Sequence, residues 1–161
     1  MEIIQNTKTE FLQAKEGMVK AFVTTPDERI NWAPSPTART PVQQVAHSAA
    51  AIGHITEMLS GNVFAPQTTE EADKGFREWE QQFSTREEVL ALLNQNSDAF
   101  ITWLDNVTPE QLGGMATLPF NLGTAPIQAM MSAPASHTRF HTAQMEYTQT
   151  IYGDQDWHLN G

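Results

Sequence analysis

The chain has 161 residues, nineteen of them acidic and nine basic, and it contains no cysteine. The lack of cysteine excludes disulfides, thiolate metal ligands and a cysteine nucleophile, and it favours a cytoplasmic location. The net charge of −10, with the lysines and arginines scattered along the chain, disfavours binding to nucleic acid or to an anionic membrane. The length predicts one domain over residues 1–161. No apolar stretch approaches the ~20 residues that a membrane span needs.

Two helices are predicted in the first part of the chain. The first covers residues 4–24, where apolar residues return at helical spacing, and it ends before Pro26. The second begins at residues 40–43, where a threonine N-cap, a proline at the first helical position and a glutamine form a capping box. Residues 41–56 include no charged side chain, so we expect most faces of this helix to be covered. Gly61 is expected to end it.

The remaining chain predicts further helices and no strand pair. A short helix is expected within residues 70–82, and a long one over 84–107, opened by a capping box between its first serine and the glutamate three residues on. Glycines and a proline mark residues 113–123 as a loop. The last helix is expected over residues 124–152 with its first threonine as N-cap, and Pro134 should kink it or split it. This pattern predicts an all-α fold: a four-helix bundle with long crossover connections, in up-down-down-up or similar topology.

Histidines on two of these helices indicate a metal site. His137 and His141 are four residues apart, which places both imidazoles on one face of the last helix, about 6 Å apart. His47 lies in the uncharged second helix, where a buried imidazole needs a hydrogen bond or a metal as its partner. His54 lies on almost the same face, but about 10 Å further along the helix axis, so one ion cannot reach both. His47 and His54 are therefore alternative third ligands, and His54 would otherwise line the pocket.

These histidines also have a simpler explanation. The His137 and His141 pair is weak evidence by itself, and His47 is compatible with a neutral core histidine bonded to a backbone carbonyl or a serine. If His47 joins the pair, three neutral nitrogen ligands leave one position open, which is the arrangement of catalytic rather than structural sites. Imidazole ligands suit zinc, nickel, copper or iron(II). The acidic residues between positions 70 and 80 are most simply explained as a solvated face.

The order and spacing of these motifs resemble the DinB/YfiT-like superfamily of proposed metalloenzymes, and the likeness covers most of the chain. Proteins of that superfamily are four-helix bundles with one histidine on the second helix and an H-x3-H pair on the last. The matching residues here are His47, His137 and His141. Further similar positions are the Trp-x-Pro step before the second helix and, on the last helix, Gln144, Tyr147 and Gly153.

The resemblance implies a bound nickel or zinc ion, a small-molecule substrate and a homodimer formed through the helices. Characterised enzymes of the group include thiol-dependent S-transferases and a maleylpyruvate isomerase, which use low-molecular-weight thiols such as bacillithiol, mycothiol or glutathione. We therefore expect a metal-dependent transferase or hydrolase-like enzyme, with His54 and Gln144 as candidates to line its pocket. The sequence departs from the family pattern at Phe140, where a histidine or basic residue is common, and at Pro134. The alternative is a non-catalytic ligand-binding or interaction module whose ion is structural or absent.

The second helix also bears on dimerisation. One of its stripes is expected to face the core, and its members are Val45, Ala49, Ile52 and Leu59. Small residues such as Ala46, Ala50 and Gly53 lie outside this stripe, and either the long loops or a second copy of the chain would cover them. The resemblance favours the homodimer.

Overall fold

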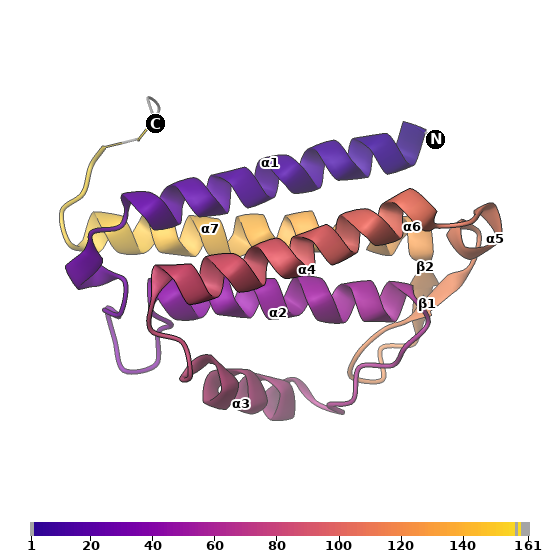
Figure 1. Ribbon diagram of the computed structural model, residues 1–161. Helices are drawn as coiled ribbons and strands as arrows, with labels where there is room; N and C mark the ends of the chain where they lie inside the picture. The colour runs from indigo at the N-terminus through magenta and orange to yellow at the C-terminus, as the bar shows by residue number, and fades with distance from the viewer. Residues whose placement is uncertain (1, 157, 159–161) are drawn as a thin grey trace.

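Four long helices lie side by side in the computed structural model, which describes residues 2–156 and 158 (Figure 1). They are α1 (Glu2–Thr24), α2 (Pro41–Leu59), α4 (Arg86–Asn106) and α7 (Ala133–Ile151). Figure 1 shows α1 and α7 running in one direction and α2 and α4 in the other. The predicted four-helix bundle and its up-down-down-up topology are therefore confirmed.

Three connections join the four long helices, and the first two lie before α4. Because α2 and α4 are parallel, the chain must return along the bundle between them, and α3 (Thr69–Glu80) makes this return on the outside of α2 (Figure 1). This crossover confirms the long connection and the short helix that the sequence predicts. The shorter link between α1 and α2 contains a single 3-10 turn, η1 (Asp27–Arg29).

The helix starts follow from capping side chains. Thr40 accepts a hydrogen bond from the Gln43 backbone, and the Gln43 side chain accepts one in return, so the predicted capping box of α2 is confirmed. Gly61, with φ of 96°, ends this helix as predicted. In α4 the box lies one residue later than predicted, because Thr85 is the N-cap and Glu88 is its partner.

The segment between α4 and α7 contradicts part of the sequence prediction. After α5 (Pro109–Leu112) the chain forms β1 (Met115–Thr117) and β2 (Thr124–Pro126), an antiparallel pair in which Ala116 faces Ala125. The prediction of no strand pair and of a helix starting at Thr124 was therefore wrong. Strands of three residues are too short to show an alternating pattern. Pro134 does split the helical region, into α6 (Ile127–Met130) and α7, whose first turn contains it.

Apolar side chains from all four long helices meet in the core. The rings of Phe11 in α1 and Phe100 in α4 pack edge to face, with centroids 4.9 Å apart. The stripe expected on α2 is buried, with Val45, Ala49, Ile52 and Leu59 at most 1% exposed. Outside that stripe Ala46 is also buried, and Gly53 packs against Asn96 of α4. Other parts of the same chain therefore cover much of the uncharged helix.

Within the described residues, no helix combines the length and the apolar character needed to cross a membrane.

Candidate metal centre

Three histidines from two antiparallel helices converge inside the bundle. His47 comes from the second turn of α2, and His137 and His141 come from successive turns of α7. One potential ligand atom from each lies within 4.8 Å of those of the other two. The ring centroids are 5.2 Å apart for His47 and His137, 4.8 Å for His47 and His141, and 4.5 Å for His137 and His141. The structure thus brings together the three residues that the sequence singled out.

The spacing fits an ion after a small adjustment of the side chains. Two metal–nitrogen bonds of about 2.1 Å span at most about 4.2 Å, so the imidazoles must close slightly around an ion. His141 is buried, whereas His47 and His137 are partly accessible. The side of the cluster formed by these two residues is therefore the one that solvent can reach.

A buried carboxylate fixes His47. Its Nδ1 atom lies 2.8 Å from Oε1 of Glu80, the last residue of α3. Because an ionised carboxylate only accepts hydrogen bonds, Nδ1 is the protonated nitrogen, and Nε2 is left free for a metal. Arg39 donates from Nε to Oε2 of the same carboxylate at 2.7 Å. Glu80 thus contacts His47, a candidate ligand, on one side and the guanidinium of Arg39 on the other.

The environment of Glu80 differs from the sequence prediction. The acidic residues of this region were expected to form a solvated face, but Glu80 is 0% exposed. Burial raises its pKa, yet hydrogen bonds from His47 and Arg39 outweigh burial and hold the pKa of Glu80 below its ordinary value. The signal that could have found it is helical spacing, because Glu80 follows Phe76 by four residues and shares its inward face.

Gln144 plays a similar part for His141. Its Oε1 atom lies 2.8 Å from Nδ1 of His141, one turn away on α7. The amide oxygen accepts from Nδ1, so the Nε2 atom of His141 is also left free. Gln144 was predicted as a pocket-lining residue, and here it contacts a histidine of the cluster directly.

Burial keeps two of the three histidines neutral. It lowers the pKa of His137 to about 3, with repulsion from His141 and His47 adding to the effect. Burial likewise lowers the pKa of His141 to about 4, and His47 again adds repulsion. Both imidazoles are therefore unprotonated at neutral pH, which is the form that binds a metal ion.

The surroundings of one His137 nitrogen indicate whether the three histidines are suited to a metal ion. Its Nδ1 atom is buried and has no hydrogen-bond partner within the described part of the chain. A buried polar atom without a partner costs free energy, and this one belongs to a cluster of three imidazoles. Three imidazoles of this kind suit zinc or nickel, so the cluster fits a divalent ion.

His54 does not join the cluster. The Phe76 ring lies between the two histidines of α2, with its centroid 4.8 Å from that of His47 and 5.6 Å from that of His54. Of the two alternative third ligands, the structure therefore brings His47 to the pair on α7. His54 lines a separate pocket between α2 and α3.

A shallow hollow lies next to Arg39 and Gln144. It has a volume of about 280 Å³, and Arg39, Gln144 and Tyr147 contribute to its lining. Arg39 bonds to Glu80 and Gln144 to His141, so two of its lining residues each touch a group that belongs to the centre. None of the three histidines lines the hollow, which is connected to them only through Arg39 and Gln144.

Two crystal structures of bacterial proteins have the same fold. A conserved protein from Enterococcus faecalis matches with a TM-score of 0.71 and 16% sequence identity, over 96% of this chain and 99% of that one. A protein from Streptococcus pneumoniae matches with a TM-score of 0.64 and 15% identity, over 90% of this chain and 91% of that one. At these identities the likeness shows the fold alone. No match was found among curated proteins.

The sequence profile of the DinB superfamily matches residues 10–145. This range is most of the chain, and it includes His47, His137 and His141. The chain therefore belongs to the DinB superfamily.

Proposed function

We propose that this protein binds one divalent metal ion through His47, His137 and His141 and acts on a small molecule as a metal-dependent enzyme. The observation that supports this most strongly is the convergence of the three imidazoles from α2 and α7. The group contains no fourth histidine, cysteine, aspartate or glutamate among the residues that the structure describes. Three protein ligands with one position left open are typical of catalytic zinc sites.

The surrounding residues would hold the cluster ready for an ion. Glu80 fixes the ring and tautomer of His47, and Gln144 does the same for His141. Arg39 compensates the buried charge of Glu80. A zinc or nickel ion, when bound, would supply Lewis-acid chemistry that lowers the pKa of a thiol or of water. The protein's part is to exclude solvent from His141 and to present His137 and His141 unprotonated.

More specifically, we propose that the protein is a cytoplasmic thiol-dependent S-transferase. The family resemblance supports this reaction type, and the hollow beside Gln144 offers space for a small thiol. Low-molecular-weight thiols are kept reduced in the cytoplasm, which agrees with a chain that has no cysteine to form a disulfide.

The test is to purify the protein without an affinity tag, determine its metal content, and load the apoprotein with zinc or nickel. Bacillithiol, mycothiol or glutathione is then mixed with an electrophile such as 1-chloro-2,4-dinitrobenzene, and loss of free thiol is followed. We expect catalysed loss by the loaded protein and by a His158→Ala variant, but not by His141→Ala. Stoichiometric metal without turnover of any thiol would contradict the S-transferase, and absence of metal binding would contradict the proposal as a whole.

A further inference from the structure

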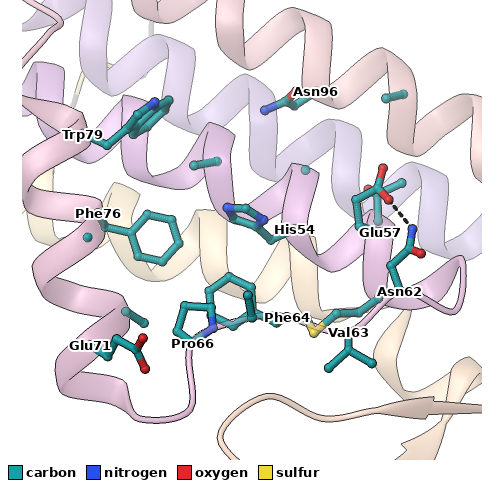
Figure 2. Close-up of a pocket in the computed structure, with 18 residues that line it drawn as sticks. His54, Glu57, Asn62, Val63, Phe64, Pro66, Glu71, Phe76, Trp79 and Asn96 are labelled. Carbon is teal, nitrogen blue, oxygen red and sulfur yellow. Dashed lines mark hydrogen bonds between the residues drawn. The ribbon is translucent and has the colours of Figure 1, made fainter.

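A second cavity lies between α2, α3 and α4, on the far side of Phe76 from His47. Its volume of about 810 Å³ falls within the range of small-molecule pockets, about 300–1,000 Å³. Figure 2 shows the rings of His54 and Phe76 facing the same space, with Phe64 and Pro66 beside them. The segment that joins α2 to α3 closes this side of the cavity.

Small residues keep this space open. The helices that enclose it present glycine or alanine to it, at Ala50, Gly53, Ala72, Gly75 and Ala99. A Cβ atom added at Gly75 would meet no other atom within 4 Å. Small side chains at these positions leave the space open, and a longer side chain at position 75, which lines the cavity, would meet open space rather than packed atoms.

Aromatic rings form the walls. His54 and Phe64 pack edge to face with centroids 5.0 Å apart, and Phe64 lies nearly parallel to Phe76 at 6.2 Å. Trp79 and Val63 also line the cavity, and they are 36% and 67% exposed. Apolar surface that stays open to solvent at the rim of a pocket indicates a place where a ligand is bound.

The charges that line the cavity are of one sign. Glu57 and Glu71 contribute carboxylates, whereas none of the described lining residues is lysine or arginine. Burial lowers the pKa of His54, so this imidazole is neutral at neutral pH and adds no positive charge. Aromatic faces together with carboxylates attract cations and disfavour anions.

We propose that this cavity is a second small-molecule site, which takes a planar aromatic ligand carrying an amine. Its aromatic part lies among Phe64, Phe76 and Trp79, and its ammonium group is directed towards Glu57 or Glu71. This site uses none of the three histidines of the metal centre, so the inference stands independently of the proposed function.

Tryptamine is the probe, and indole-3-propionate is its matched acid. Each is titrated into metal-free protein, and binding is followed by two-dimensional NMR. Tryptamine should bind saturably and at least about tenfold more tightly than the acid. A tenfold difference in affinity corresponds to about 1.4 kcal/mol, which the ammonium group would gain from the aromatic faces and the carboxylates. Shifted resonances should map to α3 and residues 62–66. Absence of saturable binding, equal affinity for the acid, or shifts centred on His137 would each overturn the proposal.

Gly75 offers a matched pair of variants. Gly75 is exposed on α3, so both Gly75→Ala and Gly75→Leu should fold, and thermal melts check this. The alanine variant should bind tryptamine like the natural protein, and the leucine variant should lose binding because its side chain occupies the cavity. Unchanged binding by Gly75→Leu would overturn the proposal. If Gly75→Leu changed only the mass measured by light scattering, a second copy would be the occupant, and the proposal would again be wrong.

A charge variant tests the amine separately. Glu57→Gln combined with Glu71→Gln keeps the shape of both side chains and removes their charge. This variant should bind tryptamine more weakly while its affinity for the acid stays the same or rises. An unchanged preference for tryptamine would contradict the role assigned to the carboxylates.

Discussion

The Nδ1 atom of His47 lies 2.8 Å from Oε1 of Glu80, although 33 residues separate them in the chain. The pair joins the second turn of α2 to the end of α3, which is the crossover helix of the bundle. A ligand histidine with a carboxylate behind it has a fixed ring orientation and a more basic free nitrogen. The crossover thus connects the topology of the fold to the candidate metal centre.

This pairing predicts that Glu80→Ala weakens metal binding about 10–100-fold. The variant should also destabilise the metal-free protein by about 3–5 kcal/mol, because Arg39 and His47 lose a buried partner. Competition with a chromophoric chelator measures the affinity, and urea unfolding measures the stability. Glu78→Ala is the matched control, since that side chain is 67% exposed. Equal metal affinity in both variants would contradict the role of Glu80.

The three histidines should be needed for the metal and not for the fold. Replacing His47, His137 or His141 singly by alanine should abolish stoichiometric zinc or nickel binding, because two imidazoles hold an ion weakly. Circular dichroism should show nearly unchanged helix content, since the bundle has its own apolar core. His54→Ala, on the far side of Phe76, should bind metal normally. An unfolded His141→Ala variant would instead make the site structural.

The metal-free protein should lose stability as the pH falls from about 6.5 towards 4. An unfolded chain protonates its histidines near pH 6.5, whereas folding lowers the pKa of His137 to about 3 and that of His141 to about 4. Between these values the unfolded state binds more protons, so the free energy of unfolding rises with pH. The slope is up to about 1.4 kcal/mol per pH unit for each histidine.

Urea unfolding at several pH values measures this slope. A variant with both His137→Gln and His141→Gln should show a flatter profile over the same range, because it lacks the two titrating groups. Equal slopes for the two proteins would show that other groups cause the pH dependence. Metal affinity should fall over this range as well, since protons compete with the ion for the same nitrogens.

The N-cap of α4 is Thr85 in the structure, whereas the sequence prediction placed it at Ser84. Thr85→Ala should destabilise the protein by about 1 kcal/mol, because the Thr85 side chain accepts the hydrogen bond from the Glu88 backbone. Ser84→Ala, at the N-cap position that the sequence predicted, should change the stability by less than about 0.5 kcal/mol. Thermal or urea unfolding compares the two, and the reverse order would place the cap at Ser84.

Dimerisation stays a prediction, and the structure suggests a face for it. Phe140, Tyr147 and Ile151 are 63%, 69% and 50% exposed, and their spacing places them along one side of α7. Light scattering should give about twice the 17.9 kDa of one chain. Phe140→Glu combined with Tyr147→Glu should give the monomer mass, whereas Val23→Glu, an exposed position on α1, should not. A monomer mass for the natural protein would contradict this prediction.

Long helices and their apolar stripes could be predicted from the sequence because periodicity and caps are local signals. The capping box at Thr40 and the buried stripe of Val45, Ala49, Ile52 and Leu59 are examples. The two strands could not be predicted, since three residues each give no pattern, and Thr124 with Pro126 mimics a helix start. Local signals therefore locate the bundle but not the hairpin within its last connection.

The candidate metal centre likewise has a part that could be predicted from the sequence and a part that could not. His137 and His141 are four residues apart on one helix, so their meeting was predictable from spacing alone. The choice between His47 and His54 depended on how α2 and α7 pack, which is not local information. The role of Glu80 depended on where the crossover helix lies, because its spacing from Phe76 places it on the inward face but does not show what that face meets. The packing of the helices decides both the choice of His47 over His54 and the role of Glu80.

The most direct test of the central claim is X-ray absorption spectroscopy of the zinc- or nickel-loaded protein at the metal edge. We expect one ion per chain with three imidazole ligands at about 2.0–2.1 Å and at least one further light ligand that exchanges with added thiol. Loss of the imidazole signal in His47→Ala, with the signal retained in His54→Ala, would assign the third ligand. A loaded protein whose ion shows no imidazole scattering, or four permanent protein ligands, would contradict a three-histidine centre with an open position.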